Sequence, residues 1–209
     1  MTKPVVSQDG TAFLGNSGEP SDAAHIHAAA NWVPADNGLV AAVAAPETMS
    51  GGGGATVAGT LYLSKIPLRY PVTVFSQIWF NISSAGLGAS TGSFTGVYDP
   101  NGNLLGTSTD IGASLLLSTG TKSFQFGTSV AIPATAGFIW AALVTNLAST
   151  QPTLRSVGQG SPSVMNTNLG NAVLRCAING TSLSALPATI TPSSNASANS
   201  FPYWFGISQ

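Results

Sequence analysis

Hydrophobic and polar residues alternate most regularly between Val72 and Ile82. β-Branched and aromatic residues dominate this stretch, and polar residues recur at the other parity, which is typical of a strand with one buried face. The apolar positions do not recur at spacings of three and four, so the pattern disfavours a helix. Phe75 and Trp79 interrupt the polar parity, which indicates that a neighbouring element covers part of that face. The expected inward positions are Val72, Val74, Ile78, Phe80 and Ile82, and the expected outward positions are Thr73, Gln77 and Asn81.

The rest of the chain after residue 55 consists of short apolar runs separated by turn residues. Residues 99–103, Asp-Pro-Asn-Gly-Asn, predict a tight turn that joins two strands into a hairpin. The continuous apolar run at residues 137–145 predicts a central strand covered on both faces. We expect the C-terminal strand to pair with the strand at 72–82 or with its neighbour. Predicted strands cover residues 56–64, 93–98, 104–107, 121–126, 129–132, 137–145, 172–178 and 203–207.

Many short strands with Gly, Pro and Asn turns predict an all-β fold, an antiparallel, jelly-roll-like β-sandwich with an extended N-terminal arm. Strand–helix alternation is absent from the pattern, which argues against a parallel α/β fold. The four glycines Gly51–Gly54 predict a flexible joint, and no Gly-Lys-Ser/Thr follows them as in a phosphate loop. We therefore expect an N-terminal attachment arm (residues 1–50), a glycine-rich joint (residues 51–58) and a β-sandwich head (residues 59–209).

Charge is scarce: charged residues make up 6% of the chain, against about 25% in ordinary soluble domains. A surface built from neutral hydroxyl and amide groups is usual on extracellular and particle-bound proteins. The net charge of −1 offers no electrostatic footprint for nucleic acid. Before Gly51 one lysine stands against five carboxylates, a net charge of −4. After Gly54 five cations stand against two carboxylates, a net charge of +3, and this shift supports a boundary near the glycines.

Cysteine use and hydropathy narrow the setting further. Cys176 is the only cysteine, so the chain has no internal disulfide, and its apolar neighbours predict a buried, inert thiol. The most apolar run, residues 137–144, is too short to cross a bilayer, which needs about 20 residues, so we expect no membrane insertion. The N-terminus lacks the apolar run of a signal peptide, and we expect synthesis in a host cytoplasm.

His25 and His27 form the sharpest local motif. On an extended strand the two side chains share a face, whereas on a helix they do not, and residues 22–31 also predict a short helix. One chain supplies only two ligands, but three chains around a threefold axis would supply six. The alternatives are therefore an iron or other transition-metal site at a trimer axis and a pair of exposed surface histidines.

Catalytic groups are few. Both histidines lie outside the predicted sandwich, so no Ser-His-Asp arrangement forms there. Asp99 and Asp110 are its only carboxylates, and two acids are the minimum for a glycosidase. Asp99 is explained more simply as the first residue of a turn, where its side chain accepts hydrogen bonds from nearby backbone N–H groups. We expect no enzymatic activity.

Aromatic side chains are candidates for glycan contact, because amphipathic rings stack on apolar sugar faces while their polar atoms form hydrogen bonds. Tyr70, Tyr98 and Trp204 are the residues we select for this role. Packing in the core is the competing explanation for each of them.

Five stretches from Gly59 onward carry a family resemblance. They resemble the C-terminal domains of minor tail and fibre-type proteins from phages of actinobacteria, over roughly seven tenths of the chain. The resemblance implies a virion structural protein, often trimeric, with a sandwich head, and it carries over no functional residues. The His-x-His motif is similar to the metal sites of trimeric phage tail fibres and spikes, in which stacked histidines hold iron. The five stretches are Gly59-Thr-Leu-Tyr-Leu-Ser-Lys-Ile-Pro-Leu, Gly92-Ser-Phe-Thr-Gly-Val-Tyr-Asp-Pro-Asn-Gly-Asn-Leu-Leu-Gly-Thr-Ser, Leu174-Arg-Cys-Ala-Ile-Asn-Gly-Thr, Ala185-Leu-Pro-Ala-Thr-Ile-Thr and Tyr203-Trp-Phe-Gly-Ile-Ser.

These features together predict a non-enzymatic phage virion protein, located on the tail or fibre, that carries a β-sandwich head with host surface glycans as a candidate ligand. We expect Phe13, Leu14, Trp32 and Leu39 to dock onto other virion proteins. A homotrimer would cover the strand edges that so few charges leave unprotected. The alternatives are a capsid decoration protein or head fibre of the same build, and a free carbohydrate-binding module.

Overall fold

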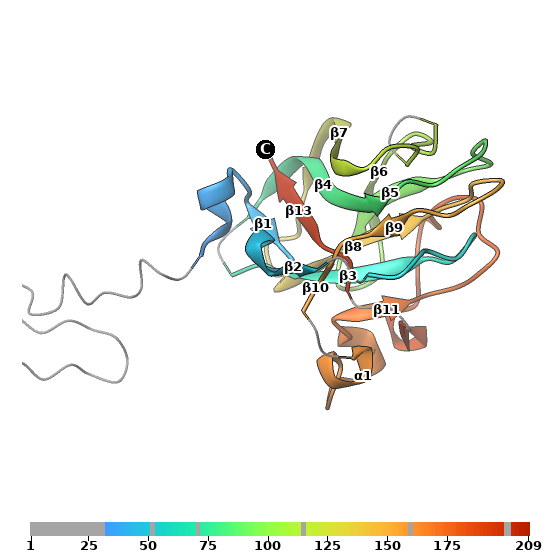
Figure 1. The fold of residues 1–209 in the computed structure, drawn as a ribbon. Coiled ribbons are helices and arrows are strands. Elements are labelled where there is room, and N and C mark those ends of the chain that lie inside the picture. Colours follow the sequence, from blue (N-terminus) through green and yellow to red (C-terminus); the bar gives the residue numbers. More distant parts are fainter. Residues whose placement is uncertain (1–31, 51–52, 70–71, 114–115, 159–160, 199–201) are drawn as a thin grey trace, which may run out of the picture.

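The computed structural model describes residues 32–50, 53–69, 72–113, 116–158, 161–198 and 202–209, which form an antiparallel β-sandwich (Figure 1). The strands are β1 (Ala41–Ala42), β2 (Met49–Ser50), β3 (Tyr62–Pro67), β4 (Val74–Ser84), β5 (Phe94–Tyr98), β6 (Leu104–Thr107), β7 (Gly120–Ala131), β8 (Phe138–Val144), β9 (Thr153–Leu154), β10 (Ser156–Val157), β11 (Cys176–Ile178), β12 (Ala196–Ser197) and β13 (Phe205–Ser208). The helices are α1 (Pro162–Met165) and the 3-10 turns η2 (Pro34–Asn37), η3 (Pro46–Thr48), η4 (Asn171–Val173) and η5 (Pro192–Ser194).

Two sheets build the sandwich. Sheet I has the order β1-β13-β4-β7, with β9 also paired to β4, and sheet II has the order β12-β11-β3-β8-β5-β6. A separate pair joins β2 to β10. The C-terminal strand β13 pairs with β4 from Phe205 opposite Phe80 to Ser208 opposite Gln77, which confirms the predicted pairing.

Strand β4 is the long strand that the alternation predicted, but its parity changes once. Ile78, Phe80 and Ile82 are buried as expected, whereas Val74 is 36% exposed and Phe75 is fully buried. The pairing of β4 with β7 shifts register between Phe75 and Gln77. Between the pairs that these two residues form, β4 has one residue, Ser76, and β7 has four, residues 126–129, so a bulge interrupts the ladder and the buried face of β4 changes parity there. Phe75 therefore does not break the polar face but points into the core on the far side of the bulge.

Strand β8 is buried on both faces, as its continuous apolar run predicted. Alternate residues enter two different clusters: Ile139 packs in the core between the sheets, and Trp140 packs on the outer face of sheet II. Side chains from the parts of segment 161–198 that lie outside β11 cover that outer face. The covering residues include Leu169, Leu174, Leu183, Leu186 and Ile190.

The predicted hairpin forms between β5 and β6. Asp99 accepts hydrogen bonds from the backbone N–H of Asn103 at 2.9 Å and from its Nδ2 at 2.8 Å, while the Asp99 carbonyl accepts the Gly102 N–H. Gly102 has φ of 91°, a conformation that favours glycine. The turn chemistry explains Asp99, as the sequence indicated.

Several predicted strands change their limits. The strand expected at 56–64 begins only at Tyr62 and continues to Pro67, and Val57 is 60% exposed. The two strands expected at 121–126 and 129–132 are one strand, β7, because Gly127 continues the extended backbone. The strand expected at 172–178 is reduced to Cys176–Ile178, preceded by η4.

Residues 32–50 pack against the sandwich, which corrects the prediction of an extended arm for this part of residues 1–50. Strand β1 pairs with β13, and the flanking N–H groups of Val40 and Val43 donate to the carbonyls of Ile207 and Phe205. Ala41 and Ala42 are buried in the core of the sandwich. The segment has no long apolar run, so the sequence predicted an extended arm. Strand pairing and burial hold it against the sandwich instead.

The described part of the predicted joint, residues 53–58, is also fixed. Gly53 is buried, and a Cβ at this position would collide with the carbonyl oxygen of Leu154. Thr56 is buried and shares a 2.7 Å hydrogen bond with the hydroxyl of Thr145. Glycine at position 53 allows the backbone to approach Leu154 closely. This corrects the prediction of a flexible joint for residues 53–58.

Candidate functional site

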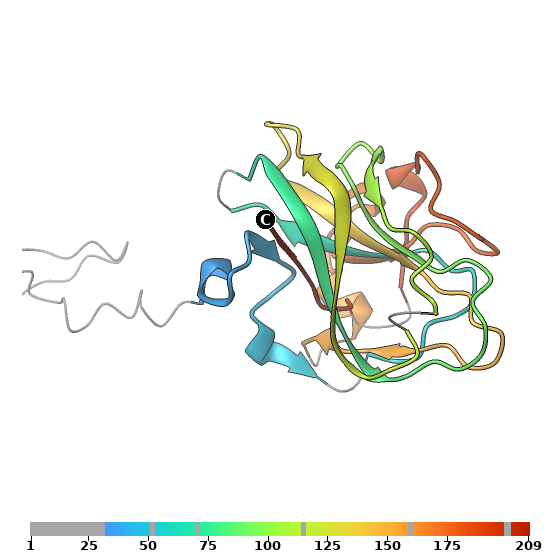
Figure 2. The same ribbon diagram turned by 90° about the horizontal axis from the view of Figure 1, so that it is seen from above.

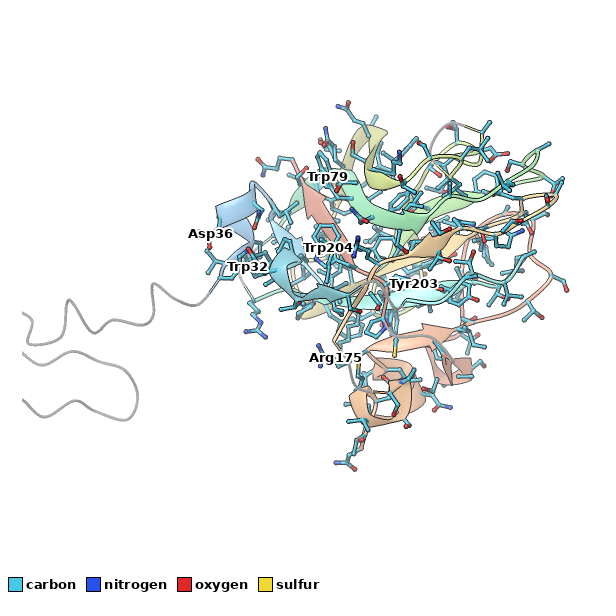
Figure 3. All side chains as sticks on the ribbon, in the orientation of Figure 1. Trp32, Asp36, Trp79, Arg175, Tyr203 and Trp204 are labelled. Carbon is cyan, nitrogen blue, oxygen red and sulfur yellow. The ribbon has the colours of Figure 1, made fainter. Side chains whose placement is uncertain are left out.

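The N-terminal segment enters the sandwich through a tight turn, residues 32–38, which we call the N-terminal turn. Trp32 donates its Nε1–H to Oδ1 of Asn37 at 2.6 Å, and the Val33 N–H donates to Oδ2 of Asp36 at 3.0 Å. Pro34 starts the 3-10 turn η2, and Gly38, with φ of 68°, ends it: the Gly38 N–H donates to the Ala35 carbonyl and the Leu39 N–H to the Pro34 carbonyl. These local bonds hold Trp32 half-buried at the end of the molecule (Figure 3).

Leu39 follows the N-terminal turn and packs onto β13. Leu39 is 8% exposed, and its Cδ1 methyl group lies 2.9 Å from the position that a Cβ on Gly206 would take. Trp204, from the same strand, is 4% exposed and donates its Nε1–H to the Ala44 carbonyl at 2.9 Å. Leu39 and Trp204 therefore hold residues 39–44 against sheet I.

A hollow with a volume of about 610 Å³ opens beside this segment. We call it the basic groove. Its walls bring together the N-terminal turn, the segment around β1, the end of β3 and the residue that precedes β11. The lining residues are Trp32, Val33, Pro34, Val40, Ala41, Ala42, Val43, Ala44, Ala45, Pro67, Arg69 and Arg175.

Positive charge in the basic groove lacks a partner among the described residues. Arg69 and Arg175 are exposed, and neither guanidinium group forms a hydrogen bond or ion pair with another described residue. Lys65 lies near Arg175: its Nζ sits 4.1 Å from the centre of the Phe138 ring and donates to the Val173 carbonyl at 3.3 Å. Burial, and secondarily the charge of Arg175, lower the pKa of Lys65. Arg175 thus adds to a local excess of positive charge.

Two further hollows adjoin the basic groove. The second, of about 400 Å³, is more apolar and shares Val33, Pro34 and Val40 with it; we call it the apolar groove. The third, of about 320 Å³, shares Arg69 with the basic groove. The N-terminal segment lines the first two hollows, and the third adjoins them without contacting that segment. Figure 2 shows this blue segment beside the C-terminus at one end of the molecule. The remaining lining residues of the apolar groove are Ala35, Leu39, Val72, Thr73, Val74 and Gln209.

Of the predicted docking residues, Trp32 lines the basic groove and Leu39 forms part of the core beneath the apolar groove. Phe13 and Leu14 lie outside the described residues. The structure therefore brings Trp32 and Leu39 to one end of the molecule, but only Trp32 keeps a substantial exposed surface.

The glycan-contact prediction is wrong for Tyr98 and Trp204, because the structure buries both rings. Tyr98 is 0% exposed and donates its hydroxyl hydrogen to the Pro187 carbonyl at 2.7 Å, and burial raises its pKa strongly. Trp204 is covered by residues 39–44, as described above. The segment 161–198 and the N-terminal segment cover faces that the alternation alone left open. Tyr70 lies outside the described residues.

The metal prediction, His25 and His27, also lies outside the described residues. Within the described ranges no three His, Cys, Asp or Glu side chains are grouped so that they could hold a metal ion. Cys176 is buried, and its burial raises the pKa of the thiol. Asn166 fixes the neighbouring backbone: its Oδ1 accepts the N–H of Arg175 at 2.8 Å, and its Nδ2 donates to the Cys176 carbonyl at 2.8 Å.

Asp110, the second carboxylate of the predicted head, accepts hydrogen bonds from residues of the loops around it. Its Oδ1 accepts hydrogen bonds from the Ser90 hydroxyl at 2.8 Å and from the N–H groups of Ser93 at 3.1 Å and Gly112 at 2.8 Å. Partial burial alone would raise its pKa, but these three hydrogen bonds together lower it. A carboxylate held ionised by loop amides is suited to fixing a loop and poorly suited to donating a proton.

Sequence reasoning missed Arg69 and Arg175 as a pair. They lie 106 positions apart, Arg69 just after β3 and Arg175 just before β11, and the antiparallel pairing of these two strands brings both residues to one groove. The net charge of +3 after Gly54 indicated a basic head but not where the charge gathers.

No family model, curated protein or solved structure matches this chain in the comparisons. Within the described residues, no helix is both long and apolar enough to cross a membrane.

Proposed function

We propose that the protein is a non-enzymatic structural protein of a phage virion, attached to the particle at its N-terminal end and displaying the β-sandwich. The observation that carries the proposal is that three hollows adjoin one another and that the N-terminal segment lines two of them. Adjoining concave surfaces of this kind suit contact with a partner protein. The protein would thus present one end to the particle and the other to the medium.

The opposite end of the sandwich supports a displayed, non-catalytic role. Figure 1 shows the loop between β8 and β9 at the end away from β1, and the loop between β4 and β5 pairs with it there, Leu87 with Thr150 and Ser90 with Leu147. Internal hydrogen bonds tie these loops together: Asn146 donates its Nδ2–H groups to the carbonyls of Gly92 at 2.7 Å and Leu183 at 2.8 Å. Asp110 fixes a loop at this end and Asp99 fixes the β5–β6 turn at the opposite end of β5, so neither is positioned as a catalytic acid. Such loops form a stable surface and not a reaction site.

A homotrimer belongs to the same proposal. Strand β7 is 12 residues long, lies at the end of the strand order of sheet I and carries a single charged residue, Lys122. Long edge strands without charged side chains readily pair with other chains unless they are covered. Association of three copies would cover β7, and the mass of the protein measured by light scattering tests this: a monomeric mass refutes an intrinsic trimer.

The particle-docking role of the apolar groove can be tested with a matched pair of exposed valines. Val74 lines this groove and is 36% exposed, whereas Val57 is 60% exposed and lines none of the three hollows. We expect Val74→Asp to reduce the amount of protein that copurifies with particles, because a carboxylate in an apolar interface must be desolvated. Val57→Asp should leave that amount unchanged. Equal incorporation of both variants would refute docking through the apolar groove.

A carbohydrate-binding module is the second candidate, and the outer face of sheet I favours it. Trp79 is half-buried there, donates its Nε1–H to the Ser208 hydroxyl at 2.9 Å and lies in register with Ser123. Gln77 and Gln125 form the next polar pair along the same strands. One aromatic ring among neutral amide and hydroxyl groups suits a sugar. Glycan-array binding that Trp79→Ala abolishes would favour this candidate, and no binding by the wild type would refute it.

A further inference from the structure

The basic groove is a positively charged surface without an acidic partner among the described residues. Arg69 and Arg175 are both exposed on its wall, and their guanidinium groups contact no carboxylate of that set. The nearest acidic side chain of the N-terminal turn, Asp36, accepts the Val33 N–H. Exposed arginine pairs of this kind attract carboxylates, which accept both N–H groups of the guanidinium fork.

The chain itself contains an acidic segment of suitable length. Residues 1–31 hold Lys3 and three carboxylates, those of Asp9, Glu19 and Asp22, which gives a net charge of −2 with neutral histidines. The described remainder holds five cations and four carboxylates, a net charge of +1. The two parts of the chain therefore carry opposite charge, and the positive part gathers two of its cations in the basic groove.

The place where the acidic segment joins the sandwich favours a contact within one chain. Trp32, the first described residue, is itself part of the groove wall. Asp22 lies ten positions before it, and an extended chain over ten positions spans at most about 35 Å. A segment tethered beside its binding surface acts at an effective concentration in the millimolar range, which outweighs free competitors at lower concentration.

From this charge complementarity and tether we propose that the basic groove binds the acidic N-terminal segment, residues 9–22, of the same chain. Arg69 and Arg175 pair with carboxylates of that segment. The contact is polar and exposed, so it is reversible and weakens as salt screens it. The bound segment covers one of the hollows that a particle would contact. This inference concerns the free protein and stands whether or not the protein is a virion component.

Amide hydrogen exchange of the full-length protein at low ionic strength tests the proposal. We expect exchange in peptides covering residues 9–22 to be slower in the wild type than in the double variant Arg69→Glu/Arg175→Glu. The expected factor is about tenfold, as two exposed ion pairs near the upper end of their usual strength would give. The matched control, Lys122→Glu/Arg155→Glu, removes the same charge outside the groove and should keep the wild-type exchange. Unchanged exchange in β4 and β13 would show that each variant is folded.

A charge swap completes the test. Adding Asp9→Lys, Glu19→Lys and Asp22→Lys to the Arg69→Glu/Arg175→Glu variant should restore the slow exchange, because the attraction returns with reversed signs. Fast exchange of residues 9–22 in the wild type, or equal loss of protection in the control, would overturn the proposal. Protection that increases with protein concentration and accompanies a doubled mass would assign the occupant to a second copy, and it would overturn binding within one chain.

Discussion

If residues 32–50 pack into the sandwich, the side chain of Leu39 contributes to stability, whereas in a free arm it would not. The change in the free energy of unfolding caused by Leu39→Ala therefore separates the two cases. The side chain is 8% exposed and lies over Gly206 of β13. Burial of a leucine side chain contributes about 1.5–3 kcal/mol. With the cavity included, Leu→Ala changes in cores cost about 2–5 kcal/mol. Because Leu39 also lines the apolar groove, water can enter the space left by the substitution, so we expect the lower part of that range, about 2–3 kcal/mol.

Equilibrium unfolding in urea provides the assay. With a slope near 2 kcal/mol/M, usual for a domain of this size, Leu39→Ala should lower the midpoint by about 1–1.5 M at an unchanged slope. Leu87→Ala is the matched control, since Leu87 is 58% exposed, and its effect should stay within about 0.5 kcal/mol. If Leu39→Ala unfolds at the same midpoint as the wild type, the segment does not pack on β13, and residues 32–50 form an arm after all.

Three further changes test other parts of the structure. Gly53→Ala should destabilise the fold by about 1–3 kcal/mol in the same urea assay, because its methyl group would strike backbone, whereas Gly127→Ala meets open space and should be near neutral. Asn166→Ala should lower the thermal midpoint measured by circular dichroism, since it leaves buried backbone groups near β11 unpaired at about 1–3 kcal/mol for each group; an unchanged midpoint would contradict these bonds. The pKa of Asp110 is lowered in the folded state, so its stabilising effect is full above the unfolded pKa and is lost as the pH falls through the folded pKa. Asp110→Asn should therefore lower the free energy of unfolding at pH 7 but not at strongly acidic pH. A difference between the two proteins that does not change with pH would contradict this role of Asp110.

The local features of the fold were predictable from the sequence. The alternation around Phe80, the continuous apolar run of β8 and the turn that starts at Asp99 each depend on neighbouring residues, and all three are confirmed. The bulge at Phe75 was not predictable, because it arises from the register between two strands 50 residues apart. The alternation did show that Phe75 was anomalous, and this was the available sign of the bulge.

The errors in the candidate site have a common physical origin. Tyr98 lies on a strand whose outer face is covered by the segment 161–198, most of which lacks strand periodicity. Trp204 and Leu39 lie 165 positions apart in the sequence, yet both pack around Gly206 of β13. Gly53 belongs to a glycine run that predicts flexibility, yet its backbone contact with Leu154 requires a residue without a side chain. In each case a contact distant in sequence decides the exposure, and neither composition nor periodicity encodes that contact.

The most direct test of the proposed particle attachment is the amount of this protein in purified particles of the phage that the proposal takes as its source, measured by quantitative mass spectrometry. The full chain should copurify with the particles. A chain that begins at Trp32 keeps the N-terminal turn and β1 but loses residues 1–31, and it should be folded but depleted from particles. Absence of the full chain from particles would contradict a virion role. Equal incorporation of the two chains would contradict attachment through the N-terminal arm.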